Sequence, residues 1–158
     1  MPLQTAAFTD EEFAQWRDRS IATYAAEKIA VGTWSADQAV ECSRQSFDSL
    51  LPAGLATPDH VIRRVNGTET GELIGWFWVG PASSESAPDT GWLYDIEVLP
   101  AHRGNHYGKL FMAFAEAEAR QLGFTKLGLH VFAPNPIARR LYESCGYAIT
   151  DYSYAKIL

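Results

Sequence analysis

Residues 94–109 read YDIEVLPAHRGNHYGK, and this stretch predicts the fold more clearly than any other part of the chain. Its first residues have the near alternation of a strand, and the strand ends at Pro100. A short loop with Arg103 and Gly104 follows, and a helix begins near residues 106–108. A strand that passes through a short loop into a helix is typical of an α/β sheet. Several backbone N–H groups and the positive end of the helix dipole then point at one spot.

The loop of this stretch has the composition of an anion-binding site. Glycine lets a phosphate come close to the backbone, and Arg103 and Lys109 add positive charge. The GxxxxGK[ST] pattern of triphosphate-binding loops is absent, and so is the three-glycine dinucleotide fingerprint. The loop therefore predicts a pyrophosphate cradle. The alternative is an ordinary β–α connection whose glycines only make the turn.

A second informative stretch, residues 129–147, reads LHVFAPNPIARRLYESCGY. Asn135 is suited to the N-cap of a short helix. Pro136 is suited to its first position, since proline lacks only an N–H that would have no partner there. Tyr142 lies seven residues after Asn135, about two helical turns, and therefore on the side of the cap. Its hydroxyl could reach a ligand lying along the helix, or the side chain could pack in the core.

The rest of the chain continues the α/β pattern. Apolar spacing and capping residues predict helices over residues 10–31, 36–50, 106–122 and 136–144. Residue content and turn signals predict strands over 60–65, 72–79, 91–98 and 126–132, a turn at Asn66 and Gly67, and one or two final strands within 147–158. We expect one domain over residues 1–158, with a sheet that is antiparallel first and parallel where helices cross over.

Charge is distributed unevenly along the 158 residues, whose formal net charge is −6 at pH 7. Residues 1–100 hold 6 basic and 15 acidic side chains, whereas residues 101–158 hold 7 basic and 4 acidic ones. The overall acidity argues against nucleic acid as a partner, because nucleic-acid binding needs a basic face. It suits a cationic substrate, or it serves only solubility.

The composition also limits where the protein can be located and which cofactors it can bind. The chain is 47% hydrophobic, which is enough for a core, yet no apolar run approaches the roughly 18–20 residues of a membrane span. The N-terminus lacks the basic and apolar regions of a secretory signal. Cys42 and Cys145 stand far apart without a CxxC motif, so we expect no zinc site, although a single disulfide stays open. These features predict a cytoplasmic protein that binds neither a metal nor a membrane.

Together the two stretches resemble the GNAT superfamily of acyl-CoA-dependent N-acetyltransferases, over at least residues 72–158. The loop of this family reads Arg/Gln-x-x-Gly-x-Gly/Ala, and residues 103–108 read RGNHYG, with His106 where glycine is usual. Residues 26–34 and 50–58 are similar to a bacterial branch of the family. The resemblance implies a GNAT fold: a mixed α/β sheet flanked by helices, with an antiparallel N-terminal meander and a splayed parallel pair at the cofactor site.

The resemblance also implies how acetyl-CoA would bind as cosubstrate. The backbone around Ile96 and Val98 would hold the pantetheine arm like an added strand, and the Val98 N–H would polarise the acetyl carbonyl. Asn135 would contact the pantetheine or cap its helix. The residues expected to bind the pyrophosphate are Arg103, Gly104, Asn105, His106, Tyr107, Gly108 and Lys109. The His106 side chain would either assist this anion or point to solvent, and we favour solvent.

The same resemblance assigns Tyr142 as the acid that protonates the departing CoA thiolate. The acceptor amine must also lose a proton, and Glu97 is the leading base, directly or through water. Asp95 shares the strand face of Glu97 and could form a carboxylate pair that raises one pKa. The alternatives for both acids are binding of a substrate ammonium and simple solvation.

We therefore expect an enzyme that moves an acetyl group from acetyl-CoA to a primary amine of a small molecule or peptide. The amine would attack directly in a ternary complex. The alternative is a non-catalytic acyl-CoA-binding sensor or interaction module on the same fold, which would need neither Glu97 nor Tyr142. Many relatives dimerise, so the resemblance also allows a homodimer.

Overall fold

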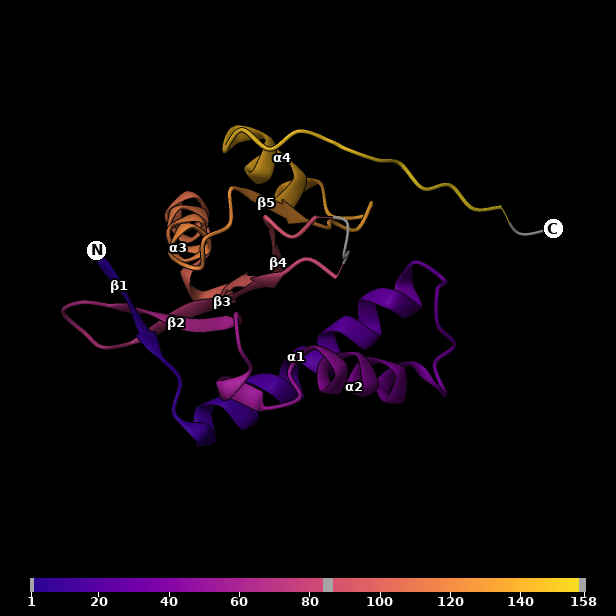
Figure 1. The fold of residues 1–158 in the computed structure, drawn as a ribbon, viewed down its shortest axis with the longest axis horizontal. Coiled ribbons are helices and arrows are strands. Elements are labelled where there is room, and N and C mark those ends of the chain that lie inside the picture. The colour runs from indigo at the N-terminus through magenta and orange to yellow at the C-terminus, as the bar shows by residue number, and fades with distance from the viewer. Residues whose placement is uncertain (1, 84–86, 157–158) are drawn as a thin grey trace.

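The computed structural model describes residues 2–83 and 87–156, and its centre is one five-stranded sheet between two layers of helices (Figure 1). The strands follow the order β1-β2-β3-β4-β5 across the sheet. Their bounds are Leu3–Ala7 for β1, Val61–Gly67 for β2, Leu73–Pro81 for β3, Thr90–Val98 for β4 and Lys126–Leu129 for β5. Pairing is antiparallel from β1 to β4 and parallel between β4 and β5. The predicted mixed α/β sheet is thus confirmed.

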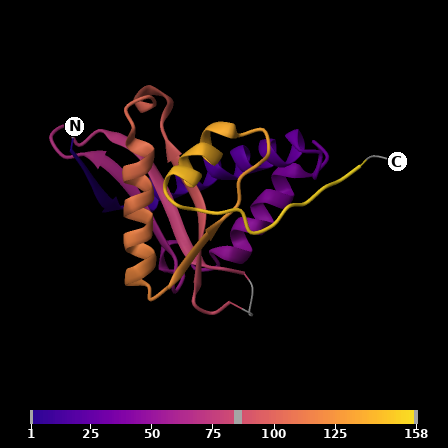
Figure 2. The ribbon, with the colours of Figure 1, turned by 90° about the horizontal axis from the view of Figure 1, so that it is seen from above.

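Four α-helices cover the two faces of the sheet (Figures 1 and 2). On one face lie α1 (Asp10–Ala30) and α2 (Ala39–Leu50), and on the other lie α3 (Tyr107–Gln121) and α4 (Pro136–Ser144). Short 3-10 turns span Gly54–Ala56 and Pro100–His102. Helix α2 begins later than predicted, because the N–H groups of Gln38 and Ala39 both bond to the Ser35 carbonyl in a preceding turn.

The sheet carries a hydrophobic core on each face. Buried Phe77 and Leu93 pack with Phe111 of α3, whereas buried Trp76 and Trp78 pack toward α1 and α2. Strand β3 is buried on both faces, which explains why its sequence is almost continuously apolar rather than alternating.

Strand β4 contains a bulge that determines which side chains face α1 and α2. Trp78 pairs with Asp95, and the next residue, Val79, pairs with Leu93. Tyr94 is therefore the extra residue of the bulge and has no pairing partner on β3. Tyr94 packs with the core cluster on the α1–α2 face, and Asp95 bonds to side chains of α1. The bulge therefore turns two consecutive side chains toward the same helices.

In the N-terminal half, one strand was missed and one turn prediction was wrong. Strand β1 was not predicted, because LQTAA has little β-propensity and is extended only through its pairing with β2. Asn66 and Gly67 do not form the turn; they belong to β2. The turn follows them, and Asn66 Nδ2 supports it by donating to the Gly71 carbonyl at 2.7 Å.

Two predictions near the C-terminus were also wrong. Strand β5 ends at Leu129 rather than at residue 132, because its ladder with β4 stops there. The final strands expected within 147–158 are absent from residues 147–156, and residues 157–158 lie outside the described part of the chain. A strand-like composition needs a neighbouring strand, and within residues 2–83 and 87–156 none lies against this segment.

Candidate active site

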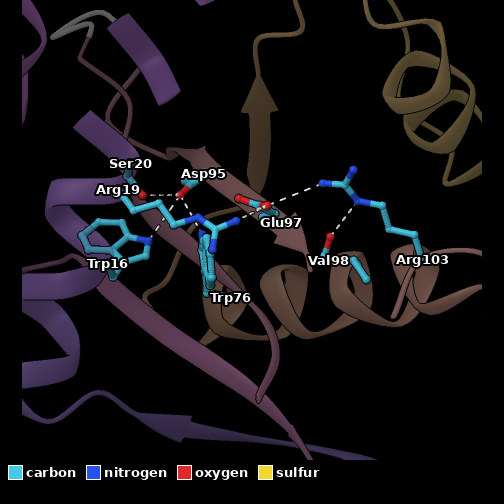
Figure 3. Close-up of polar contacts among 8 residues, drawn as sticks. All are labelled: Trp16, Arg19, Ser20, Trp76, Asp95, Glu97, Val98 and Arg103. Carbon is cyan, nitrogen blue, oxygen red and sulfur yellow. Dashed lines mark hydrogen bonds and ion pairs between the residues drawn. The ribbon is translucent and has the colours of Figure 1, made fainter. Parts of the chain in front are cut away.

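The edge of β4 that faces β5 is open over its second half. The parallel ladder ends with Leu93 opposite Leu129. Leu99 donates its N–H to Ile74 of β3, so alternation turns the peptide groups of Val98 and Ile96 toward the open edge. The Val98 carbonyl indeed accepts a hydrogen bond from Arg103 Nε at 3.0 Å there (Figure 3). An extended ligand could therefore pair with this backbone.

A cavity of about 500 Å³ adjoins this edge and is bordered by α1, α2, β4, residues 130–132 and Tyr142. Its volume suits a small-molecule site. Its titratable lining residues are Tyr24, Glu27, Lys28, Tyr94, Asp95, Glu97, Arg103, His130 and Tyr142. The cavity thus brings together Glu97, Tyr142, Ile96 and Arg103, which the sequence placed in one site.

Asp95 lies deep in the protein but stays partly accessible from this cavity. Three donors hold its Oδ2 atom: Trp76 Nε1 at 2.9 Å, Ser20 Oγ at 3.2 Å and Trp16 Nε1 at 3.3 Å (Figure 3). Burial raises the pKa of Asp95 to about 6, against the lowering effect of these hydrogen bonds, and the charge of Glu97 adds to the rise. The carboxyl group is therefore fixed in place and titrates close to neutral pH.

Glu97 is held differently, although it lies on the same face of β4. Its Oε1 atom lies 2.9 Å from Arg19 of α1 and 3.5 Å from Arg103 of the loop (Figure 3). The Arg19 guanidinium also lies over the Trp76 ring, 4.9 Å from its centroid. The two arginines join α1 and the loop to β4 through this single carboxylate.

Glu27 of α1 is a third carboxylate of the cavity, and the sequence analysis did not single it out. Partial burial raises its pKa, and the negative charges of Asp95 and Glu97 raise it further. Among the described residues, neither Glu27 nor Asp95 forms an ion pair with a basic side chain. The sequence spacing could have indicated Glu27, because Ser20 and Glu27 lie seven residues apart and therefore share a face of α1.

Tyr142 projects from α4 into the same cavity. Burial raises its pKa to about 12, and the charges of Asp95 and Glu27 contribute in the same direction. The phenol therefore keeps its proton at neutral pH. Asn135 caps the helix that carries it, since its Oδ1 accepts from the Ala138 N–H at 3.1 Å.

Lys28 and His130 line the other end of the cavity. The Lys28 ammonium lies over the rings of Tyr24, Trp34 and Phe132, at 5.3, 5.6 and 5.8 Å from their centroids. Burial lowers the pKa of His130, and the positive charge of Lys28 lowers it further. His130 is thus neutral at physiological pH, and Lys28 links α1 to the segment that follows β5.

The loop before α3 has the backbone of an anion site. Gly104 and His106 both adopt positive φ, at 82° and 60°. His106 occupies the N-cap position with no side-chain hydrogen bond to the helix, so the first N–H groups of α3 have no capping side chain. The His106 side chain is exposed, and its left-handed backbone explains why glycine is usual at this position.

The remaining loop residues divide between exposed and packed positions. Arg103, Gly104, Asn105 and Lys109 are exposed, and Asn105 Nδ2 donates to the His102 carbonyl at 3.0 Å. Tyr107 and Gly108 are partly buried. A Cβ atom on Gly108 would lie 2.9 Å from Leu141 of α4, so this glycine allows α3 and α4 to approach closely.

The sequence model of the Acetyltransferase (GNAT) family matches residues 7–147, and the chain belongs to this family. It is 38% identical over 157 residues to a Bacillus subtilis protein named as the uncharacterised N-acetyltransferase YycN, covering 99% of this chain and 96% of YycN. It is 33% identical over 150 residues to the similarly named YdgE of the same organism, covering 95% and 94% of the two chains.

Solved structures agree with this assignment. The crystal structure of Bacillus subtilis YycN superposes with a TM-score of 0.89 at 34% identity and covers 99% of each chain. PaiA N-acetyltransferase from Thermoplasma acidophilum, solved with coenzyme A, has a TM-score of 0.67 at 14% identity over 97% of this chain and 94% of its own. At that identity PaiA supports the fold alone.

Across residues 2–83 and 87–156, no cluster of three or more His, Cys, Asp or Glu side chains is arranged to hold a metal ion. In the same part of the chain, no helix is long and apolar enough to cross a membrane. Cys42 and Cys145 are both free.

Proposed function

We propose that the chain is a single GNAT domain over residues 1–158 that transfers an acetyl group from acetyl-CoA to a primary amine of a small molecule or peptide. One observation carries the proposal. The open edge of β4, a carboxylate with a pKa of about 6 and a protonated Tyr142 phenol all border one cavity. Membership of the GNAT acetyltransferase family supports both the acetyl transfer and acetyl-CoA as the cosubstrate.

The backbone and loop fit coenzyme A. The peptide groups of Ile96 and Val98 face the open edge, where they can pair with pantetheine amides and where the Val98 N–H can polarise the acetyl carbonyl. The uncapped N–H groups at the start of α3 suit the pyrophosphate, together with Lys109 and the exposed backbone of Gly104, Asn105 and His106.

Arg103 has a double role in this proposal. Its guanidinium bonds to the Val98 carbonyl and to Glu97, on the edge where pantetheine would lie. Binding of the cofactor phosphates would draw this exposed side chain toward the loop and free both partners. Cofactor binding would therefore change the contacts of Glu97 on the acceptor side of the cavity through Arg103.

Asp95 and Glu97 are the two candidates for accepting the proton of the attacking amine. Glu97 is engaged by Arg19 of α1, a contact that remains when Arg103 turns toward the cofactor phosphates. In Asp95 all three side-chain donors bond to Oδ2, which leaves Oδ1 available to a substrate, and its pKa of about 6 is close to the operating pH of a general base. These contacts favour Asp95 as the base and Glu97 as a side chain that orients the substrate ammonium.

Tyr142 is the proposed acid. With a pKa of about 12 it holds its proton until a strong base forms nearby, and the departing thiolate is such a base. A sensor that only binds acyl-CoA would need neither this phenol nor a carboxylate opposite it. The convergence of Tyr142 and Asp95 in one cavity thus supports catalysis over sensing.

The charge of the cavity favours a cationic acceptor. Glu27 and Asp95 line it without an ion-paired base among the described residues, and aromatic rings of Tyr94, Trp78 and Phe132 offer apolar contact. An amine that carries a second ammonium group would neutralise this excess charge. The acidic first part of the sequence would then serve the acceptor side.

The experiment that tests the proposal first is ligand-induced stabilisation. Acetyl-CoA and CoA should each raise the melting temperature of the protein, because a ligand that binds only the folded state stabilises it. Pantetheine, which lacks the pyrophosphate, is the matched control and should give a smaller rise in the melting temperature. No shift at about millimolar acetyl-CoA would refute the proposal.

A further inference from the structure

A second cavity, of about 210 Å³, lies where α1 crosses β2 and β3, outside the candidate active site. Among the described residues, the two cavities share no lining side chain. The floor of the second cavity is aromatic, since Phe8, Trp16 and Trp76 line it and are at most 9% exposed. A cavity of about 150 Å³ in a protein core can hold benzene. This cavity therefore has room for one ring with a short substituent.

The charged side chains of this cavity favour an anion. Arg19 and Arg64 stand against one carboxylate, that of Glu12. Both oxygens of Glu12 already have partners, because Oε1 bonds to Arg64 and Oε2 accepts from the Thr9 N–H at 2.8 Å. The Arg64 Nε atom is buried and has no hydrogen-bond partner among the described residues. A carboxylate held by the two guanidiniums would complete the contacts of this cavity.

The register of the sheet connects this cavity to the active site. Arg64 of β2 pairs with Trp76 of β3, and Trp76 pairs with Glu97 of β4. Paired residues project from the same face of a sheet, so these side chains form one row under α1. The Arg19 guanidinium lies over the Trp76 ring and bonds to Glu97 at 2.9 Å (Figure 3). Because Arg19 lines one cavity and Glu97 the other, their ion pair spans the wall between them.

The two tryptophans of the floor form a second connection between the cavities. Trp16 and Trp76 line the second cavity, and their Nε1–H groups donate to Asp95 Oδ2 at 3.3 and 2.9 Å (Figure 3). Asp95 itself lines the active-site cavity. A ligand that moves either indole ring would therefore move a hydrogen-bond donor of Asp95.

We propose that the second cavity is an effector site for a small aromatic carboxylate. Its ring would pack on Trp16 and Trp76, and its carboxylate would bond to Arg19 and Arg64. The bound carboxylate would compete with Glu97 for Arg19 and so release Glu97 toward the active-site cavity. Such coupling is reciprocal, so loss of the Glu97 charge should tighten binding of the carboxylate. Binding and competition do not depend on the proposed reaction, whereas an effect on turnover rests on it.

The first test is calorimetric titration of the full chain with phenylacetate. A ligand of this size should bind with a Kd of about 1 mM or lower. The matched controls are 2-phenylethanol, which has the ring without the charge, and acetate, which has the charge without the ring. Each should bind about tenfold more weakly or worse, because it loses one of the two kinds of contact. No binding of phenylacetate at about 10 mM, or equal binding of 2-phenylethanol, would overturn the proposal.

Nuclear magnetic resonance of the indole N–H groups locates the probe on the unmodified protein. Phenylacetate should shift the signals of Trp16 and Trp76, which line the second cavity, and leave that of Trp34 in place. Trp92 lines the active-site cavity and should also be unaffected. A shift of Trp92 without Trp16 and Trp76 would place the probe in the active site and overturn the proposal.

Two variants test the charge contacts and the coupling. Arg64→Gln should raise the Kd for phenylacetate about tenfold or more, whereas Arg44→Gln, at an exposed position on α2, should leave it unchanged. Glu97→Gln should lower the Kd about threefold or more, because Arg19 is then free to bind the probe. Asp18→Asn, which removes an exposed charge of α1, is its control. An unchanged Kd in Arg64→Gln would overturn the site, and an unchanged or higher Kd in Glu97→Gln would overturn the coupling.

Discussion

The carboxylate of Asp95 on β4 and the phenol of Tyr142 on α4 line the same cavity, and the charge of Asp95 helps to raise the pKa of Tyr142. Burial raises the pKa of Tyr142 to about 12, with added contributions from the charges of Asp95 and Glu27. Burial also raises the pKa of Asp95 to about 6. Near neutral pH one cavity therefore holds a deprotonated carboxylate and a protonated phenol, the two groups proposed to accept the proton of the amine and to protonate the thiolate.

Asp95→Asn should stabilise the protein at high pH and not at low pH. The pKa of Asp95 is raised from 3.8 to about 6, so the folded state binds this proton more tightly than the unfolded chain does. The contribution of Asp95 to stability is complete below about pH 4 and is lost as the pH rises through about 6. The amide is never charged, so the variant should gain about 2–3 kcal/mol at pH 8 and little at pH 4.

Urea unfolding at the two pH values measures this gain. Asp18→Asn removes an exposed carboxylate in the middle of α1 and serves as the control, with no expected difference between the two pH values. An Asp95→Asn gain of equal size at pH 4 and pH 8 would show that the effect does not come from the charge.

The pH dependence of turnover separates the two candidate bases. With Asp95 as the base, kcat/KM should rise with pH through about 6, and Asp95→Asn should lower it by about 10²–10⁴-fold and remove this limb. Glu97→Gln should raise KM for the amine and keep the limb. A limb that survives in Asp95→Asn and vanishes in Glu97→Gln would assign the base to Glu97.

Tyr142→Phe should lower turnover and leave cofactor binding intact. The substitution removes only the hydroxyl, so the partly buried ring keeps its packing against the core. We expect kcat to fall about 10²-fold or more, with the Kd for CoA changed by less than about threefold. Turnover by stopped-flow thiol detection and calorimetric titration of CoA provide the two numbers. An unchanged kcat would remove Tyr142 as the acid.

Much of the fold could be read from local sequence. The stretch 94–109 predicted β4, the loop and α3, because strand composition, Pro100 and the glycines act over a few neighbouring residues. Strand β1 and the C-terminal segment could not be predicted in this way. The first is extended only through its pairing with β2, and the second has no partner strand in the part of the chain that the structure describes.

For the candidate site, the sequence indicated the residues of β4 and α4 but not the side chains of α1 that contact them. Both acids of β4 and Tyr142 follow from motif and alternation, and they do border one cavity. The partners that distinguish Asp95 from Glu97 are distant in sequence: Trp16, Ser20 and Arg19 come from α1, some 75–79 residues before the side chains they contact. Only the packing of α1 against the sheet brings them there, and no short-range pattern encodes it.

His106→Gly should stabilise the protein without weakening cofactor binding. His106 has a φ of 60°, a conformation that costs about 1 kcal/mol for residues other than glycine, and its side chain is exposed. Relief of this strain should raise the melting temperature by a few degrees. His106→Val is the opposite control and should lower it, since a β-branched side chain disfavours positive φ. If the Kd for CoA rose tenfold in His106→Gly, the imidazole would be a cofactor ligand.

Glu27→Gln should reduce the preference for an acceptor with a second positive charge. Putrescine, butylamine and γ-aminobutyrate share a four-carbon chain and differ at the far end in an ammonium, a methyl group and a carboxylate. We expect the ratio of kcat/KM for putrescine over butylamine to fall about tenfold in Glu27→Gln, with butylamine itself little changed. Asp18→Asn, on the same helix but exposed, is the matched control. An unaltered ratio would place the second ammonium elsewhere.

Transfer of an acetyl group from acetyl-CoA to a cationic amine in this cavity can be measured directly. The most direct measurement is the release of CoA thiol by the unmodified protein with each of these three amines, with the acetylated product verified by mass spectrometry. We expect thiol release above the amine-free rate, fastest with putrescine and slowest with γ-aminobutyrate. Thiol release that no amine accelerates would contradict the transfer, and a preference for γ-aminobutyrate would contradict the role of Glu27 and Asp95.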